Sequence, residues 1–331
     1  MTRAILISLA VFVLLPGLGI AETIRVPSDR GAVQTAIDAA SDFDTVLVSP
    51  GIYAENIDFS GKAIVLLSTH GRDATFIDAA DPNMTIVRFV SGEDTTSVID
   101  GFTIRHTTDA LGIYCFGSHP IIRNCDISFC FHTGDGAGIY CTSSSAKIRR
   151  NRIHDNHGTL TGGAIVVTGI HAGILEIFGN EMYYNSSANG PGIGCGVTSR
   201  NVSIERNLIW GNVGTGSLAG GIYVSGQSFS VVNNTVVANT KGIMVYQGAG
   251  DIRNNIVAIN VGEGLDPGSV SFDYNDVWGN GSLNDPGVNG ISLDPLFIDS
   301  VNHVYALASE SPCIDAGDPD PQYNELDGTR N

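Results

Sequence analysis

The hexapeptide Ile148-Arg-Arg-Asn151-Arg-Ile153 decides the fold, because the chain repeats it with the same apolar and Asn positions. Successive copies lie about 25 residues apart, which is the spacing of a solenoid repeat rather than of a heptad. The copies are a degenerate Ile99-Asp-Gly-Phe102-Thr-Ile104, then Ile122-Arg-Asn-Cys125-Asp-Ile127, Ile177-Phe-Gly-Asn180-Glu-Met182, Ile204-Glu-Arg-Asn207-Leu-Ile209, Val231-Val-Asn-Asn234-Thr-Val236, Ile252-Arg-Asn-Asn255-Ile-Val257 and Phe272-Asp-Tyr-Asn275-Asp-Val277. The chain is therefore a repeat protein.

A second motif, Gly followed by Ile, lies about half a repeat away from each hexapeptide. Its copies are Gly112-Ile113-Tyr114, Gly138-Ile139-Tyr140, Gly192-Ile193-Gly194, Gly221-Ile222-Tyr223 and Gly242-Ile243-Met244, with Gly163-Ala164-Ile165 as a looser one. Each repeat thus contains three short β-branched segments separated by Gly or Asn, and none is long enough to show a helical period. The pattern predicts an all-β, parallel β-helix with three strands per coil.

Stacking of like strands should place like residues in ladders inside the coils. The expected inward ladders are Ile99, Ile122, Ile148, Ile177, Ile204, Val231, Ile252 and Phe272; Ile104, Ile127, Ile153, Met182, Ile209, Val236, Val257 and Val277; and Ile113, Ile139, Ile193, Ile222 and Ile243. The Asn column between the first two ladders, which includes Asn151, Asn180, Asn207 and Asn234, is expected at a sharp bend. There Asn tolerates the left-handed conformation, and its amide can bond the coils above and below.

The segments outside the regular repeats divide the chain into four parts. Ala32–Ala40 has apolar residues at helical spacing, and we expect it to cap the open end of the solenoid. Irregular opening coils are expected at Thr45–Ser49, Ile57–Phe59, Ile64–Ser68 and Phe76–Ile77. The predicted parts are a signal peptide at 1–21, the capping helix and opening coils at 22–97, regular coils at 98–280 and an acidic C-terminal cap or tail at 281–331.

Composition and the N-terminus bear on location and partners. The chain has 17 Lys and Arg against 34 Asp and Glu, a net charge of -17, which argues against a nucleic-acid partner. Arg3, the largely apolar Ile5–Leu15 and the small residues at Gly19–Ala21 read as an export signal. That apolar stretch is too short to span a bilayer, which needs about 20 residues. We therefore expect a protein that is secreted, periplasmic or at the cell surface, without a membrane span.

Three features of the chain point to one family. They are the Asn-containing coils, the segment Val46-Leu-Val-Ser-Pro50-Gly51-Ile-Tyr53-Ala-Glu55 after the capping helix, and the closing Asp294-Pro-Leu-Phe297-Ile-Asp299 with Ser311-Pro-Cys-Ile-Asp315-Ala-Gly-Asp318. With these features the chain resembles the secreted bacterial right-handed parallel β-helix repeat proteins of the pectate-lyase-like superfamily. The resemblance implies a right-handed helix. The family contains lyases, glycosidases, esterases, epimerases and proteins without known activity, so it says little about chemistry. The ending Asp327–Asn331 stops short of the usual family terminus, which leaves truncation open.

Two outward columns beside the second ladder contain the candidate site residues. We expect the rings of His154, Tyr183 and Trp210 to lie on successive coils roughly 4.8 Å apart, where they could stack on sugars. The alternative is that aromatic residues simply favour strand surfaces.

Asp126, Arg152 and Glu181 form the neighbouring column and are the candidate catalytic residues. The two carboxylates are expected roughly 10 Å apart with the guanidinium between them, an arrangement compatible with glycoside hydrolysis or with uronate elimination. The bland alternative is an ordinary salt-bridge row. The motif sets of the polygalacturonase-like and pectin-esterase-like enzymes are missing, so no enzyme class transfers to this chain.

Metal and disulfide signals are weak. The histidines His132, His154, His157 and His171, with Asp155, read as solvated loop residues rather than a metal site. Asp318-Pro-Asp320, followed by Asn324 and Asp327, has the composition of a Ca²⁺ loop, but Tyr323 stands where an EF-hand needs Gly. We expect no resident cofactor. Of the six cysteines, only Cys115 and Cys141, one coil apart, form a pair to test as a disulfide.

Two hypotheses of function follow. In the first, an exported β-helix protein binds polysaccharide along its lateral face, and if it is an enzyme it is a polysaccharide lyase or a glycoside hydrolase. In the second, the chain is a non-catalytic surface or structural solenoid that contacts protein partners. The sequence leaves the oligomeric state open.

Overall fold

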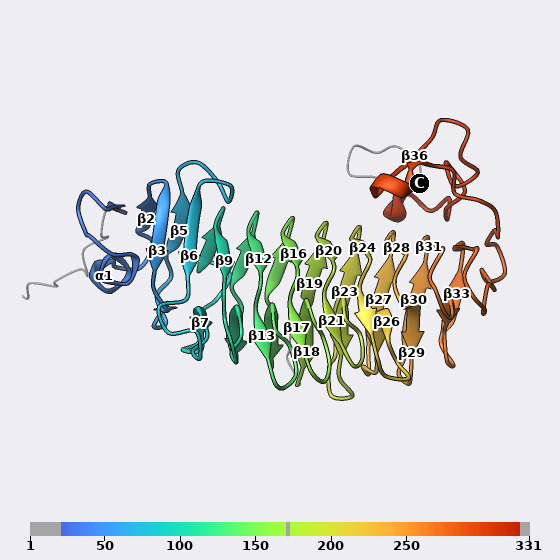
Figure 1. The fold of residues 1–331 in the computed structure, drawn as a ribbon, viewed down its shortest axis with the longest axis horizontal. Helices are drawn as coiled ribbons and strands as arrows, with labels where there is room; N and C mark the ends of the chain where they lie inside the picture. The colour runs from blue at the N-terminus through green and yellow to red at the C-terminus, as the bar shows by residue number, and fades with distance from the viewer. Residues whose placement is uncertain (1–20, 170–172, 325–331) are drawn as a thin grey trace, which may run out of the picture.

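The computed structural model describes residues 21–169 and 173–324, which form an elongated stack of coils (Figure 1). The chain is an all-β, right-handed parallel β-helix with three main strands in each coil. The repeats predict the parallel coils and their three strands, and the family resemblance implies the hand. The N-terminal signal predicted for 1–21 falls, apart from Ala21, outside the described residues.

Three parallel sheets, here called A, B and C, run along the solenoid. Sheet A consists of β1 (Thr23–Val26), β2 (Thr45–Val48), β5 (Val65–Ser68), β8 (Val98–Asp100), β11 (Ile121–Arg123), β15 (Lys147–Arg149), β19 (Leu175–Phe178), β23 (Val202–Glu205), β27 (Phe229–Val232), β30 (Gly250–Arg253) and β33 (Ser271–Asp273). Sheet B consists of β3 (Gly51–Ala54), β6 (Thr75–Asp78), β9 (Thr103–Arg105), β12 (Asp126–Ser128), β16 (Arg152–His154), β20 (Glu181–Tyr183), β24 (Leu208–Trp210), β28 (Thr235–Val237), β31 (Ile256–Ala258) and β34 (Asp276–Trp278). Sheet C consists of β4 (Ile57–Asp58), β7 (Val87–Phe89), β10 (Ile113–Phe116), β14 (Ile139–Thr142), β18 (Ile165–Thr168), β22 (Ile193–Cys195), β26 (Gly220–Val224), β29 (Lys241–Val245) and β32 (Leu265–Asp266).

The middle coils add a short fourth sheet that the repeats do not predict. Its strands are β13 (Phe131–His132), β17 (His157–Gly158), β21 (Ser186–Ser187) and β25 (Val213–Gly214). Strands β1, β3 and β7 of the opening coils were also not expected, although the three residues of β7 alternate between buried and exposed.

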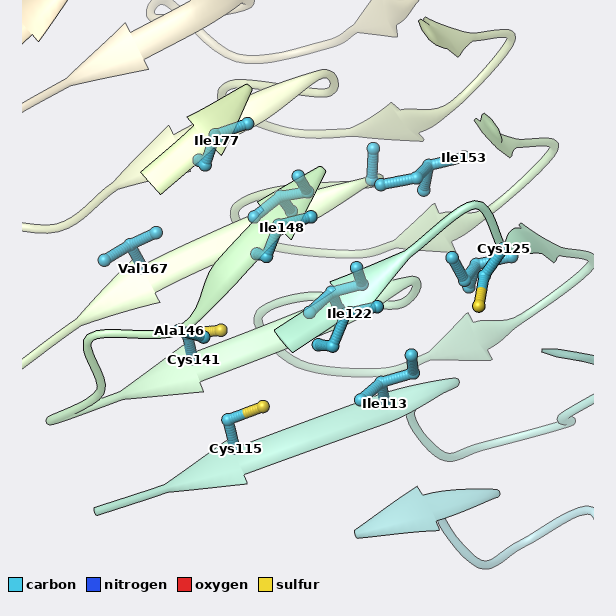
Figure 2. Close-up of a cluster of buried hydrophobic side chains, with 14 of the residues drawn as sticks. Ile113, Cys115, Ile122, Cys125, Cys141, Ala146, Ile148, Ile153, Val167 and Ile177 are labelled. Carbon is cyan, nitrogen blue, oxygen red and sulfur yellow. The ribbon is translucent and has the colours of Figure 1, made fainter. Parts of the chain in front are cut away.

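The interior is built from the predicted ladders. Ile148 pairs in register with Ile122 on one side and Ile177 on the other, and all three side chains are fully buried (Figure 2). The other ladder residues are buried as well, apart from Phe272 at the last coil, which is only partly buried. Like side chains therefore stack directly on one another, which gives each rung contacts to the coils above and below.

Two ladders of asparagine run beside the apolar ones. In the first, the Nδ2 of Asn151 donates to Oδ1 of Asn180 at 3.0 Å, and the same bond recurs from coil to coil as far as Asn275. A parallel ladder begins at Asn156 and ends at Asn280. The amide stacking is confirmed. The expected left-handed conformation is wrong for the Asn itself, because the residue before it has the positive φ, as Arg150 does at 56°.

The N-terminal helix α1 (Val33–Ala39) covers the first coils, as predicted, and buries Val33, Ala36 and Ile37. It has no side-chain cap of its own. Glu55, the residue after β3, caps the helix instead. Its carboxylate accepts hydrogen bonds from the Val33 and Gln34 backbone N–H groups at 2.8 Å. Burial and this borrowed cap hold the helix in place.

The C-terminal segment differs from the expected end cap. After β34, Ile291 bridges back to Asp276, and the chain then folds over the side of the solenoid. Its antiparallel hairpin, β35 (Phe297–Asp299) and β36 (Val304–Leu307), with the 3₁₀ turns η1 (Ser300–Asn302) and η2 (Pro321–Tyr323), lies above sheet B near β24, β28 and β31 (Figure 1). The segment therefore covers a lateral face.

The six cysteines are free thiols. Cys115 and Cys141 are register partners in the core of sheet C (Figure 2), yet they form no disulfide. Cys125 and Cys130 take the Asn position at the start of the two ladders, where their backbone N–H groups donate to Oδ1 of Asn151 and Asn156. Within the described residues, no helix is long and apolar enough to cross a membrane.

Candidate functional site: the outer face of sheet B

The outer face of sheet B carries the two columns that the sequence singles out. Strands β12, β16 and β20 pair so that Asp126, Arg152 and Glu181 follow one another in register. The next outward column continues from His154 through Tyr183 to Trp210. The predicted register of both columns is thus correct.

The three rings stack face to face. The ring centroids of His154 and Tyr183 are 4.7 Å apart with planes at 5°, and those of Tyr183 and Trp210 are 4.8 Å apart at 8°. This spacing follows from the distance between neighbouring strands. A regular row of flat rings therefore exists on this face.

Trp210, however, is only 6% exposed, so the expectation that its ring faces solvent is wrong. The C-terminal segment covers it: His303 stacks on the indole at 4.4 Å, and Tyr305 packs beside it. Trp210, Tyr305, Val237 and Ala258 form a small hydrophobic cluster of their own. Ring stacking on solvent-borne sugars is therefore available only toward the N-terminal side of Trp210.

The charged column has the expected order, because Arg152 lies between Asp126 and Glu181 in the register of the strands. Its guanidinium, however, pairs with the carboxylate of Asp73 at 3.5 Å, which is its ion pair among the described residues. Glu181 instead accepts a hydrogen bond from Nε1 of Trp210 at 3.2 Å. The column is therefore not held together by ion pairs between its own members.

His154 is held between two carboxylates. Its Nε2 lies 3.0 Å from Asp126 and its Nδ1 lies 2.7 Å from Asp155, so both ring nitrogens are engaged. Burial on its own would lower the pKa of His154, but the hydrogen bonds and negative charge of the two carboxylates outweigh it and raise the pKa above 6.5. Burial would likewise raise the pKa of Asp126, yet the bonds from His154 and Ser128 leave it below 3.8.

Tyr183 shares this environment. Burial, together with the negative charges of Asp126 and Glu181, raises the pKa of its phenol to about 12. Tyr183 therefore remains a neutral ring at ordinary pH and presents a hydrogen-bonding hydroxyl rather than a base.

A third column, here called the corner column, follows directly after the sheet B strands. The sequence reasoning missed it. Each of its residues adopts the left-handed conformation, with φ of 55° at Phe129 and 53° at Tyr184. Phe129 and Tyr184 are 51% and 46% exposed, and their rings pack edge-on against those of His154 and Tyr183, respectively. The repeat itself could have revealed this column, because its residues follow the His154 column by one position. The members are His106, Phe129, Asp155, Tyr184, Gly211, Ala238, Ile259 and Gly279.

Gly211 in this column leaves room for the Tyr184 ring, because it has no side chain. A Cβ at Gly211 would lie only 3.0 Å from Tyr184 Cε1. The open part of the face thus consists of Phe129 and Tyr184 standing out from a floor of His154 and Tyr183. Tyr184 marks its border with the covering segment, because its hydroxyl lies 3.0 Å from Nε2 of His303.

The remaining metal candidates are dispersed. His154 lies on a strand and is largely covered, so its interpretation as a solvated loop residue is wrong. His132 and His157 also lie on strands, of the short fourth sheet, and His171 is outside the described residues. Within the described chain, no three His, Cys, Asp or Glu side chains gather in a way that could hold a metal ion.

The acidic segment proposed for Ca²⁺ has other partners. The Asp318 carboxylate pairs with Arg253, and Asp320 accepts the backbone N–H of Gln322 to cap η2. Asp327 lies outside the described residues. The expectation that the chain has no resident cofactor stays a prediction.

The ionisable groups of this face already have hydrogen-bond partners. Both ring nitrogens of His154 lie against carboxylates, those of Asp126 and Asp155. Glu181 accepts a bond from the indole of Trp210.

Comparison with known proteins bears on the fold. No protein of curated function matches the sequence. Among solved structures, the pectate lyase Pel9A superposes with a TM-score of 0.58 and 14% identity, covering 95% of this chain and 98% of that one. A pectin methylesterase from carrot reaches a TM-score of only 0.43 at 14% identity, covering 84% of this chain and 90% of that one, which is too distant to support an argument. A family model described as a right handed beta helix region matches residues 88–257, more than half of the sequence, and the chain belongs to that family.

Proposed function

We propose that this chain is an exported protein that binds polysaccharide along the open part of the outer face of sheet B, without cleaving it. One observation carries the proposal: Phe129 and Tyr184 are large, half-exposed rings that flank a flat floor formed by His154 and Tyr183. Exposed aromatic residues on a rigid sheet suit the apolar faces of sugar rings.

The polar groups of this face fit the same ligand. Asp155 lies between Phe129 and Tyr184 in the corner column, and Arg152 lies in the same coil at the start of β16, so sugar hydroxyls would find an acceptor and a donor close to the rings. The pectate lyase Pel9A, which shares the fold, is by name an enzyme that acts on a polysaccharide. This supports the ligand class, and the engaged nitrogens of His154 are why we propose binding alone.

A glycan array tests the proposal on the chain from Glu22 onward, with wild type and the double variant Phe129→Ala/Tyr184→Ala. We expect wild type to bind at least one polysaccharide and the variant to bind it about tenfold more weakly or worse, by analogy with rings that stack on nucleobases for about 1 to 3 kcal/mol each. Ala is tolerated at this corner position, because Ala238 occupies it with a φ of 54°.

Tyr246→Ala is the matched control, because Tyr246 is 63% exposed but lies beyond β29 of sheet C. It should bind like wild type. Equal binding by wild type and the double variant, or no glycan bound at all, would favour the structural solenoid that contacts protein partners. Shortened products from a bound polysaccharide would contradict the absence of cleavage, and a secreted chain that does not begin at Glu22 would contradict the predicted export signal.

A further inference from the structure

A cavity lies beneath the C-terminal segment, far along the solenoid from Phe129. It has a volume of about 300 Å³. Its walls come from the last sheet B strands, from the bends between sheets A and B, and from the loop Cys313–Gly317. A water molecule takes about 30 Å³ in the liquid, so the space suits a ligand of roughly ten waters, the size of one sugar ring rather than a chain.

Asp276 is the polar centre of this cavity. It is only 4% exposed, and its carboxylate accepts bonds from the Leu293 N–H and from the Cys313 thiol, both at 3.1 Å. A thiol is a weak donor, and neither Lys nor Arg is among the residues that line the cavity. The carboxylate therefore retains acceptor capacity toward a ligand and would repel an anion.

Asn254 supplies the complementary donor. Its Oδ1 accepts the backbone N–H of Asp318 at 2.9 Å, which fixes the orientation of the amide. Its Nδ2 is buried and has no hydrogen-bond partner. A buried donor without a partner costs about 1 to 3 kcal/mol, so a ligand acceptor at this point would stabilise the site.

The lining also has aliphatic side chains, next to further polar residues such as Asn233, Thr235 and Asp315. Ile256, Ile291 and Leu307 face the same cavity. A carboxylate acceptor, an amide donor and aliphatic walls together match a molecule that has hydroxyl groups at its edge and C–H groups on its face.

We propose that this cavity binds a single neutral monosaccharide or a polyol of similar size, with Asp276 accepting from one hydroxyl and Asn254 donating to another. A hydroxyl group both donates and accepts, so it satisfies both residues. An amine could pair with Asp276 but has no acceptor for the Asn254 amide, and a sugar acid would meet the uncompensated charge of Asp276.

The test is titration of the chain from Glu22 onward with glucose, galactose, mannose, xylose and inositol, followed by saturation-transfer NMR and calorimetry. Galacturonate and glucosamine are the charged comparisons. We expect saturable binding of at least one neutral compound, and Asp276→Asn and Asn254→Gly should each weaken it by about tenfold or more.

Controls separate the site from the fold and from the sheet B face. Gly tolerates the φ of 56° at Asn254, and Asn124→Gly is the matched variant, because Asn124 has a φ of 52° at the equivalent bend far from the cavity. Asn124→Gly and the Phe129→Ala/Tyr184→Ala variant should bind the neutral compound like wild type. Asn254→Gly remains informative if Asp276→Asn does not fold.

Cys313 gives an independent readout of position. All six cysteines lie in the described residues, and only Cys313 is not buried. Burial and the neighbouring Asp276 raise the pKa of its thiol, so alkylation is followed in alkaline buffer. A bound sugar should slow that alkylation. The proposal is overturned if no neutral compound binds at high millimolar concentration, if only glucosamine or galacturonate binds, or if binding survives Asn254→Gly.

Discussion

Asp126 and Asp276 occupy the same outward column of sheet B, with five strands between theirs, and they differ in the partners of their carboxylates. At Asp126 the imidazole of His154 outweighs burial and holds the pKa of the carboxyl down. At Asp276 there is no such partner, and burial raises the pKa. The difference shows that repeat register places a residue but does not determine its environment.

The corner column explains why one half of the face is covered. In the open half its residues are mostly large, such as Phe129 and Tyr184. In the half under the hairpin they include Gly211, Ala238 and Gly279. Small corners let the C-terminal segment approach closely enough for Tyr305 to pack on Trp210 and Ala258. The covered half is therefore part of the protein's core, and the open half remains available to a ligand.

The largest effect should come from Trp210→Ala, because Trp210 belongs to the covered half. Truncation of a buried Trp costs about 3 to 5 kcal/mol, whereas Phe129→Ala in the open half, at a residue that is 51% exposed, should cost about 1 kcal/mol or less. Urea unfolding of both variants measures the contrast. Equal costs would mean that the hairpin does not cover Trp210 in solution.

The interior beneath both halves should respond in the same way. Ile153 lies beneath the open half and Ile209 beneath the covered half, and both are fully buried in one ladder. Ile153→Ala and Ile209→Ala should each lower the free energy of unfolding by about 2 to 5 kcal/mol. The measurement is again the urea midpoint, and a midpoint unchanged by either substitution would place that residue outside the core.

Arg253 on β30 should attach the covering C-terminal segment to the solenoid. It pairs with Asp318 and Asp251, and the ring of Tyr323 lies 5.2 Å from its guanidinium carbon. Arg253→Gln should weaken the attachment by about 1 to 3 kcal/mol. The consequence is faster hydrogen exchange in β36 and easier proteolysis near Asp315. Protection of β12 and β16 should not change, and a loss there would show that Arg253 supports the whole solenoid.

The smallest effect is the pH dependence of the open half. Because the pKa of His154 is raised on folding, its contribution is fully present below 6.5 and is lost as the pH rises through the folded value. The lowered pKa of Asp126 acts in the opposite direction, so its contribution is present above 3.8 and is lost as the pH falls through the folded value. His154→Gln should therefore flatten the decline in unfolding free energy above pH 6.5. An identical pH profile for the variant and wild type would mean that His154 is not held between the two carboxylates.

Sequence reasoning located the fold and most of the ring row because both depend on local repetition. A column such as Ile148, Ile177 and Ile204 can be buried only if like strands stack, and stacking at one strand spacing then sets the distance between His154 and Tyr183. The corner residues Phe129 and Tyr184 could also have been found, since they follow the same repeat by one position.

The sequence by itself determined the coils, their register, the Asn ladders and the side of the sheet on which each outward residue lies, because these follow from alternation along strands and from a period of about 25 residues. Only the tertiary structure decided that Trp210 is covered, that Arg152 turns to Asp73 and that a cavity forms around Asp276. These features depend on contacts between segments far apart in the chain, such as His303 with Trp210, and no repeat or spacing encodes where the non-repeating C-terminal segment folds back.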